Sequence, residues 1–117
     1  MIHRLLLLVT ALACAALPVF AAPAGYLFVT FKGEQSPLSE QVHFALSSDG
    51  RQWQALNDGE PVLVSKLGDK GVRDPFLLRA ADGKRFFILA TDLSIHLNHD
   101  WTRAQTKASR SIVIWES

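Results

Sequence analysis

Two apolar runs joined by one tight turn constrain the fold of this chain more than any other feature. The run PFLLR ends at Arg79, the segment AADGK follows, and RFFILAT returns from Arg85 to Thr91. An Asp-Gly pair between aromatic and β-branched runs is typical of a tight turn, because glycine adopts left-handed backbone conformations without steric cost. The sequence therefore predicts two strands connected by a turn at Asp82 and Gly83.

The remaining sequence shows no long helical periodicity and predicts further short strands between turns. These further strands are expected at Tyr26–Phe31, at Val42–Ser47, in a short arm at Gln52–Gln54 and in the run SIVIWES from Ser111 to Ser117. A polar loop is expected from Asp92 to Arg110. The predicted fold class is all-β.

A weak internal repeat indicates how these strands are arranged. HFALSSDGRQW and SIVIWES share the order of an apolar strand followed by serine, at a spacing of about 70 residues. Short strands with such a repeat are typical of β-propellers, whose blades have about four strands each. A chain of this length supplies one to two blades, and a blade packs on its neighbours. We expect a truncated propeller, with assembly from several copies as the alternative.

The first residues have the order of a secretory signal peptide. His3 and Arg4 precede an apolar run that ends at Phe20, and small residues follow. This order predicts a signal peptide over residues 1–21, cleavage after Ala21, and a secreted or periplasmic protein in which residues 22–117 form the propeller part. N-terminal sequencing of exported protein tests the expectation, and an intact Met1 on a cytosolic protein would contradict it.

The apolar start of the chain has two alternative interpretations, a membrane anchor and a lipoprotein, and its cleavage would change the net charge. A membrane anchor is disfavoured, because the run is short for a span of about 20 residues and Pro18 interrupts its end. A lipoprotein would use Cys14, the only cysteine, but the residues before it fit that signal poorly. Cleavage removes Arg4 and leaves eleven Lys and Arg against eleven Asp and Glu. Zero formal charge without a basic cluster argues against nucleic acid or an anionic membrane as partner.

The stretch GVRDPFLLR places a carboxylate, Asp74, directly before a proline and an apolar strand. Pro75 disfavours helical geometry at the preceding residue, so an extended Asp74 with a fixed direction is expected. One interpretation is structural: Asp74 caps a turn and pairs with Arg73 at the surface. The other is functional: Asp74 faces a channel and acts as a general base on water, while Arg73 balances its charge.

The series from Pro61 to Ser117 resembles the first blade of glycoside hydrolase family 43. It has an Asp-Pro that opens an innermost strand, an ADG-type turn, an aromatic return strand ending in Ala-Thr, and an Ile-x-x-Trp-x-Ser strand. The resemblance implies a five-bladed propeller that removes arabinose or xylose units from plant polysaccharides with inversion, and Asp74 as its general base. It places a second aspartate and a glutamate general acid on later blades. Glu116 receives no such role, and the chain alone is expected to be inactive.

Several other residues are candidates for contact with a sugar. Arg73, Asp92 and Trp101 are predicted to bind substrate, since aromatic faces suit the apolar faces of sugar rings and Asp92 follows the end of a strand. The other two tryptophans, Trp53 and Trp115, occupy equivalent ends of the repeat and are predicted to pack between strands.

The segment SIHLNHD raises the question of a metal site. His96, His99 and Asp100 have suitable side chains, but no third strong ligand lies near in sequence, so neither metal nor cofactor is predicted. Two hypotheses stand: part of a secreted glycoside hydrolase, or a non-catalytic carbohydrate-binding or structural β module. The expected partner is an oligosaccharide or polysaccharide. The sequence does not decide whether the sugar is arabinose or xylose or whether the action is endo or exo. It does not decide the oligomeric state either.

Overall fold

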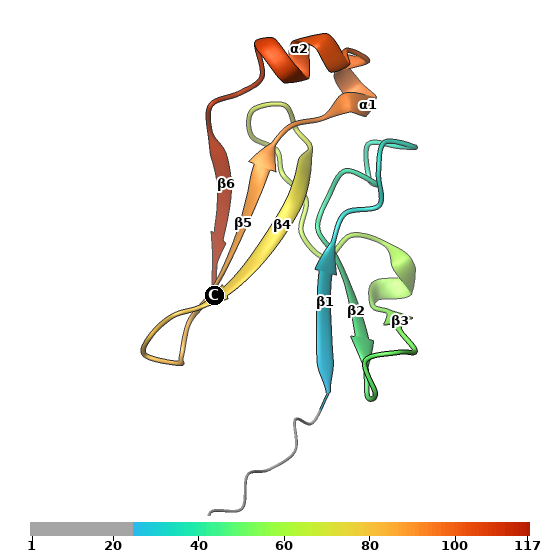
Figure 1. The fold of residues 1–117 in the computed structure, drawn as a ribbon, viewed down its shortest axis with the longest axis vertical. Coiled ribbons are helices and arrows are strands. Elements are labelled where there is room, and N and C mark those ends of the chain that lie inside the picture. The colour runs from blue at the N-terminus through green and yellow to red at the C-terminus, as the bar shows by residue number, and fades with distance from the viewer. Residues whose placement is uncertain (1–24) are drawn as a thin grey trace, which may run out of the picture.

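The computed structural model describes residues 25–117, which form two three-stranded antiparallel sheets with two short helices (Figure 1). The all-β fold class is thus confirmed, and two small sheets are consistent with parts of propeller blades. No helix within this range is long and apolar enough to cross a membrane. The predicted signal peptide, its cleavage after Ala21, and Cys14 lie outside the described residues.

The first sheet has the strand order β1-β2-β3 and uses the predicted apolar runs. Its strands are β1 (Tyr26–Thr30), β2 (His43–Ser47) and the two-residue β3 (Gln54–Ala55). A 3-10 helix, η1 (Asn57–Gly59), follows β3. Phe28 stands opposite Ala45 across the first pair, and its ring lies 5.5 Å from that of Trp53.

The second sheet contains the predicted hairpin and has the order β4-β5-β6. Its strands are β4 (Val72–Arg79), β5 (Phe86–Asp92) and β6 (Ile112–Glu116). Leu78 stands opposite Phe87, and Gly83 in the turn has a φ of +70° that glycine adopts without strain. The hairpin between β4 and β5 is therefore confirmed, and β4 and β6 form the two edges of the sheet.

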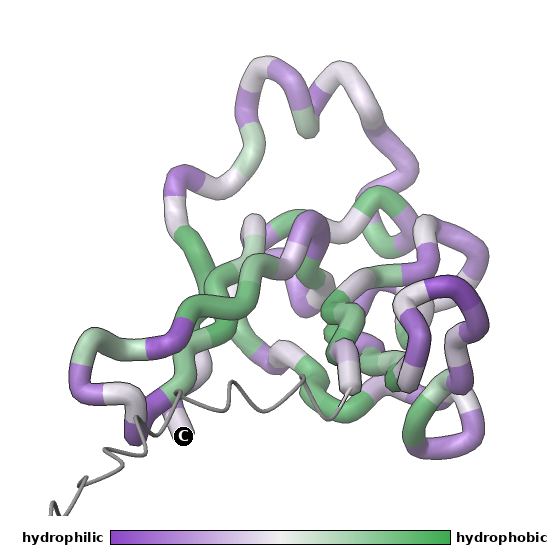
Figure 2. Tube along the Cα trace, turned by 60° about the horizontal axis from the view of Figure 1, so that its bottom comes forward, coloured by the Kyte–Doolittle hydropathy of each residue, from purple (hydrophilic) through white to green (hydrophobic). Residues whose placement is uncertain are grey.

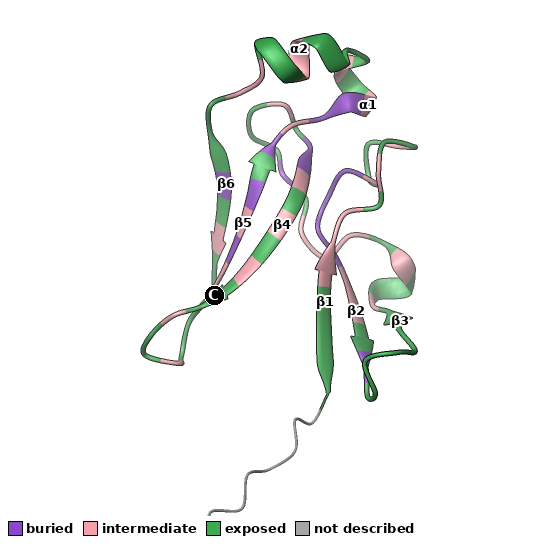
Figure 3. Ribbon diagram, viewed as in Figure 1, coloured by how far each residue is buried: buried purple, intermediate pink, exposed green. Residues whose placement is uncertain are grey.

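The two sheets pack against each other through one face of each, with β1 beside β4 (Figure 1). The buried apolar side chains are Val42, Val72, Ile88, Ala90 and Val113, and Trp115 packs against them. Apolar residues run along the strands while the loops are mostly polar (Figure 2). Buried residues concentrate in the middle of β5 and near the end of the sheets beside the helices (Figure 3).

The segment between β5 and β6 differs from the predicted polar loop. It contains α1 (Ile95–Asn98) and α2 (Trp101–Thr106). Each helix begins at a side-chain cap: Ser94 Oγ accepts a hydrogen bond from Leu97 N, and Asp100 Oδ1 accepts one from Arg103 N. Such caps satisfy backbone N–H groups that lack a partner within the helix. Because the helices are one to two turns long, their apolar periodicity is too brief to distinguish them from a loop.

The backbone of Asp74 also differs from the prediction. β4 begins two residues earlier than the Asp-Pro, and its pairing with β5 shifts between Arg73 and Phe76. At this irregularity Asp74 has a φ of +51°, in the left-handed region rather than the extended one. Pro75 is accommodated there because β4 is an edge strand, where a missing N–H is tolerated. The tertiary constraint of the bulge thus overrides the local preference imposed by proline.

Candidate active site

Arg73, at the beginning of β4, is the centre of the densest polar cluster near Asp74. Its Nη1 donates to Glu40 Oε1 at 2.7 Å and to Glu34 Oε2 at 3.1 Å. The guanidinium carbon lies 4.6 Å from the ring centroid of Phe31 and 5.0 Å from that of Trp101. Planar, weakly hydrated guanidinium groups are well suited to such aromatic and carboxylate contacts. Arg73 is consequently held in one place, with only 13% of its side chain exposed.

Glu40 anchors this cluster from the interior, where its side chain is fully buried. Its carboxylate has four donors: Arg73 Nη1 at 2.7 Å, Ser94 Oγ at 2.6 Å, Ile95 N at 2.9 Å and His96 N at 2.9 Å. Burial raises the pKa of the Glu40 carboxyl, but the hydrogen bonds from Ser94, the two backbone N–H groups and Arg73 outweigh burial and hold the pKa below its ordinary value. Glu40 is therefore an ionised carboxylate.

A glycine permits this arrangement. A Cβ atom at Gly71 would lie 2.6 Å from the Cβ of Ser94, so only glycine allows β4 and the start of α1 to approach so closely. Gly71 O also accepts a hydrogen bond from Leu93 N at 3.1 Å. The close approach brings Ser94 within reach of Glu40.

Asp74 directly follows Arg73 in β4 and is exposed. Arg73 pairs with Glu34 and Glu40 rather than with Asp74, and within residues 25–117 no ion pair or hydrogen bond reaches the Asp74 carboxylate. The turn-cap interpretation requires such a hydrogen bond. The geometry therefore leaves the Asp74 carboxylate open to water, which a general base requires.

Trp101 reaches the same place from a distant part of the sequence. It is the first residue of α2, and 49% of it remains exposed although Arg73 covers part of the ring. The helix is fastened by Arg103, whose Nη1 and Nη2 each lie 2.8 Å from a carboxylate oxygen of Asp69. The structure thus brings together two of the predicted substrate-binding residues, Trp101 and Arg73, the residue that precedes Asp74 in the chain.

Asp92 lies apart from these groups. It is the last residue of β5, is 4% exposed, and its Oδ1 accepts a hydrogen bond from Asp69 N at 2.8 Å. The loop that it supports includes Gly68, whose φ is +51° and where a Cβ atom would overlap the Asp92 carboxylate. That Asp92 binds substrate stays a prediction, and its placement below the loop favours support of the loop.

The two histidines considered as metal ligands lie on the helical segment. The His96 and His99 rings are 5.7 Å apart, and His96 Nδ1 is 3.0 Å from the backbone oxygen of Glu34. Residues 25–117 contain no group of three or more histidine, cysteine or acidic side chains with metal-binding geometry. His96 thus connects α1 to the loop that carries Glu34.

Sequence reasoning missed three members of the cluster, Phe31, Glu34 and Glu40. Both glutamates lie in the polar segment GEQSPLSE, which is typical of a solvated loop. Glu40 and Arg73 are 33 residues apart in sequence, so no local spacing indicates their contact. The one local signal is that Glu40 lies two residues before the apolar run that begins at Val42, where a charged residue is close to the core.

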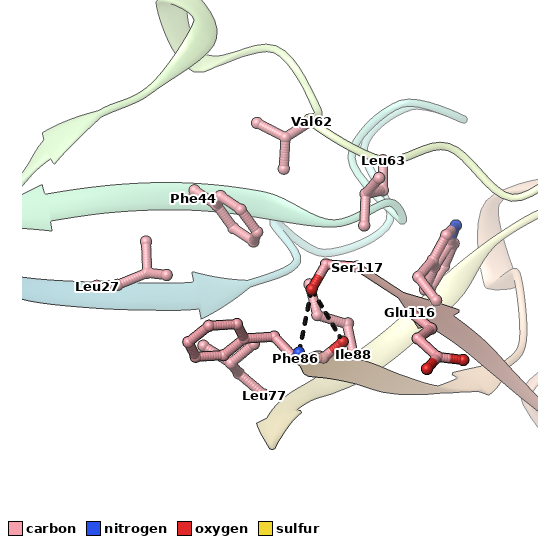
Figure 4. Close-up of a pocket in the computed structure, with 10 residues that line it drawn as sticks. Leu27, Phe44, Val62, Leu63, Leu77, Phe86, Ile88, Glu116 and Ser117 are labelled. Carbon is pink, nitrogen blue, oxygen red and sulfur yellow. Dashed lines mark hydrogen bonds between the residues drawn. The ribbon is translucent and has the colours of Figure 1, made fainter. Parts of the chain in front are cut away.

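A separate apolar cavity of about 460 Å³ lies between the sheets (Figure 4). Its walls include Leu27 and Phe44 from the first sheet and Leu77, Phe86 and Ile88 from the second. Neither Asp74 nor Arg73 lines it. Glu116 and Ser117 are the polar residues among its lining residues, and the others are apolar. We take the polar surface around Arg73 and Asp74 as the candidate active site.

Comparison with known proteins identifies the family. A family model described as a probable glycosyl hydrolase domain matches residues 22–117. An alpha-L-arabinofuranosidase from Bifidobacterium longum subsp. longum is 30% identical over 99 residues, which cover 83% of this chain and 9% of that protein. No solved structure matches the chain. The family match includes both sheets and the segment with Asp74, and the chain therefore belongs to the glycosyl hydrolase domains related to glycoside hydrolase family 43.

Proposed function

We propose that this chain supplies the general-base side of the active site of an exported glycosidase that removes arabinose or xylose units with inversion. The name of the similar protein, an alpha-L-arabinofuranosidase, supports the arabinose choice. The observation that carries the proposal is the open carboxylate of Asp74, held at a φ of +51°. Left-handed φ at a residue other than glycine costs free energy and concentrates at functional sites.

The chemistry assigns one proton transfer to this chain. In inverting hydrolysis, Asp74 takes a proton from a water molecule while that water attacks the anomeric carbon. A general acid, placed roughly 6.5–9.5 Å from the base, protonates the leaving oxygen at the same time. We assign no residue of this chain to that role, and we expect another part of a longer polypeptide to provide it. The chain spans 9% of the similar arabinofuranosidase, so residues 1–117 alone should not turn over substrate.

Arg73 and Trp101 are proposed to hold the sugar beside Asp74. Only Nη1 of Arg73 has hydrogen-bond partners within residues 25–117, which leaves Nε and Nη2 free to donate to sugar hydroxyls. The exposed part of the Trp101 ring can stack on the apolar face of a sugar. The carboxylates of Glu34 and Glu40 already neutralise the Arg73 guanidinium, which favours a neutral sugar over an anionic ligand.

The test is Asp74→Asn in a polypeptide that joins this chain to the part proposed to supply the general acid. An amide keeps the size of the side chain but cannot accept a proton from water, so turnover should fall by about 10²–10⁴-fold or more while substrate affinity changes little. Turnover and binding are measured on arabinofuranosyl and xylosyl substrates. Asp58→Asn is the matched control, since Asp58 is also exposed and has a φ of +53°. Normal turnover by the Asp74 variant would contradict the proposal, and binding without hydrolysis by the wild type would favour the carbohydrate-binding alternative.

A further inference from the structure

We propose that Glu40 is a positioning residue, which fixes the guanidinium of Arg73 next to Asp74 and so sets how the site receives the sugar. The proposal rests on the function proposed above for Arg73 and Asp74. Glu40 does not reach the surface, because its side chain is fully buried, and it acts through Arg73.

Hydrogen bonds to both carboxylate oxygens fix the orientation of the Glu40 side chain. Oε1 accepts from Arg73 and from Ile95 N, and Oε2 accepts from Ser94 and from His96 N. The backbone oxygen of Glu40 also accepts from Val72 N at 2.8 Å. A carboxylate with all its acceptor directions in use cannot rotate without breaking a hydrogen bond. Its position is therefore set by β4 and α1 together.

The second carboxylate on Arg73 is a weaker anchor. Glu34 has 44% of its side chain exposed, and its contact with Arg73 Nη1 is 3.1 Å long, against 2.7 Å for Glu40. Exposed ion pairs are screened by water and hold a side chain weakly. Without the Glu40 charge, the long Arg73 side chain would keep only this exposed partner and its contacts with two aromatic rings. The direction of its free Nε and Nη2 groups would then no longer be fixed.

Fixing Arg73 also fixes the residue that follows it. The irregularity in the β4–β5 pairing begins at Arg73, and Asp74 has its left-handed φ within that irregularity. A strained backbone persists only where surrounding contacts over-determine it. The Glu40–Arg73 pair is the buried contact next to this position, so it supports both the guanidinium and the candidate base.

A chemical probe tests the positioning without any assay of activity. Phenylglyoxal modifies accessible arginines, and mass spectrometry of the purified chain gives the rate at Arg73 relative to Arg85, which has 54% of its side chain exposed. In the wild type Arg73 should react more slowly than Arg85. Glu40→Gln should raise the ratio severalfold. Equal rates in the wild type, or no rise in the variant, would overturn the proposal.

A matched control separates positioning from a general loss of stability. Gln41 is the next residue, is 2% exposed, and bonds to Pro37 O, Lys70 O and Ser65 N without touching Arg73. Gln41→Leu should lower stability but leave the reactivity ratio unchanged, and an equal rise in this variant would overturn the proposal. Where Glu40→Gln does not fold, Ser94→Ala removes the 2.6 Å hydrogen bond and keeps the charge. It should raise the ratio to a smaller extent, and no rise would again overturn it.

A double-mutant cycle in the same joined polypeptide connects the position to catalysis. Glu40→Gln and Arg73→Met should each lower kcat/KM, and Glu40→Gln should have no further effect once Arg73 is methionine. The expected coupling is about 2- to 150-fold, the range for residues in contact. Additive losses would indicate a merely structural Glu40 and overturn the proposal. If the wild-type enzyme does not hydrolyse arabinosides or xylosides, the proposed function fails, whereas the reactivity ratio still decides whether Glu40 positions Arg73.

Discussion

At the scale of single residues, Asp74 combines an exposed carboxylate with a backbone conformation that L-residues seldom adopt. Its φ is +51°. Within residues 25–117, no group donates a hydrogen bond to its carboxylate. Left-handed geometry costs roughly 1–2 kcal/mol for a typical L-residue, and aspartate tolerates it better than alanine because its short polar side chain interacts locally.

Replacement of Asp74 by glycine and by alanine should separate strain from function. Asp74→Gly relieves the strain and should be at least as stable as the wild type, whereas Asp74→Ala should be about 1 kcal/mol less stable than the glycine variant. Both should abolish turnover, because both lack the carboxylate. Thermal or denaturant unfolding of the same polypeptide gives the order of stability. A glycine variant that melts well below the wild type would indicate that Asp74 caps a turn after all.

At the scale of elements, the sequence predicted what local patterns determine. The β4–β5 hairpin has strong apolar runs and an Asp-Gly turn, so its strands and connection were predictable. The segment from Asp92 to Arg110 was not, because α1 and α2 are too short for a periodic pattern and are stabilised by caps and by contacts distant in sequence. The candidate site divides in the same way: Arg73, Asp74 and Trp101 were proposed from local sequence patterns, whereas Glu40 contacts Arg73 only through the tertiary fold.

The attachment of α2 to the loop before β4 can be tested through Asp69. The hydrogen bond from Arg103 lowers the pKa of the Asp69 carboxyl, burial opposes it, and the net pKa is below its ordinary value. The ion pair between Asp69 and Arg103 therefore contributes its full stability above the ordinary pKa of aspartate. That stability is lost as the pH falls through the lowered pKa of Asp69 in the folded chain. Asp69→Asn should likewise accelerate hydrogen exchange severalfold at the α2 amides of Ala104 and Lys107 at neutral pH.

The β5–β6 pairing provides the internal reference for that experiment. Amides such as those between Ala90 and Val113 lie in the core and do not depend on Asp69. Their exchange should stay the same in the variant. Equal acceleration in both regions would mean that Asp69 stabilises the whole domain, and no acceleration in α2 would mean that the Arg103 pair does not hold the helix.

At the scale of the whole molecule, residues 25–117 leave one face of the second sheet uncovered. The pairing register places Phe76, Leu89 and Ile114 in one row across the three strands, and Ile112 follows on the same face. Phe76 is 63% exposed, Ile112 59% and Ile114 56%. Contiguous exposed apolar side chains of this kind mark a surface that another element covers. In a β-propeller a face of this kind would pack against the sheet of a neighbouring blade.

Left uncovered, this face should make the chain self-associate. β6 is an edge strand, and within residues 25–117 no strand pairs with its far side, so both its backbone and its apolar side chains can recruit another copy. Light scattering of the purified chain should show association that grows with concentration. Ile114→Lys places a charge on the exposed face and should reduce it, because the sheet would have to bury an unpaired ammonium. Leu67→Lys is the matched control: Leu67 is 69% exposed but lies in the loop before β4, so the same charge there should leave association unchanged. A monodisperse wild type would show that the second sheet is stable without a covering layer. Equal effects of the two lysine substitutions would show that this face does not mediate the association.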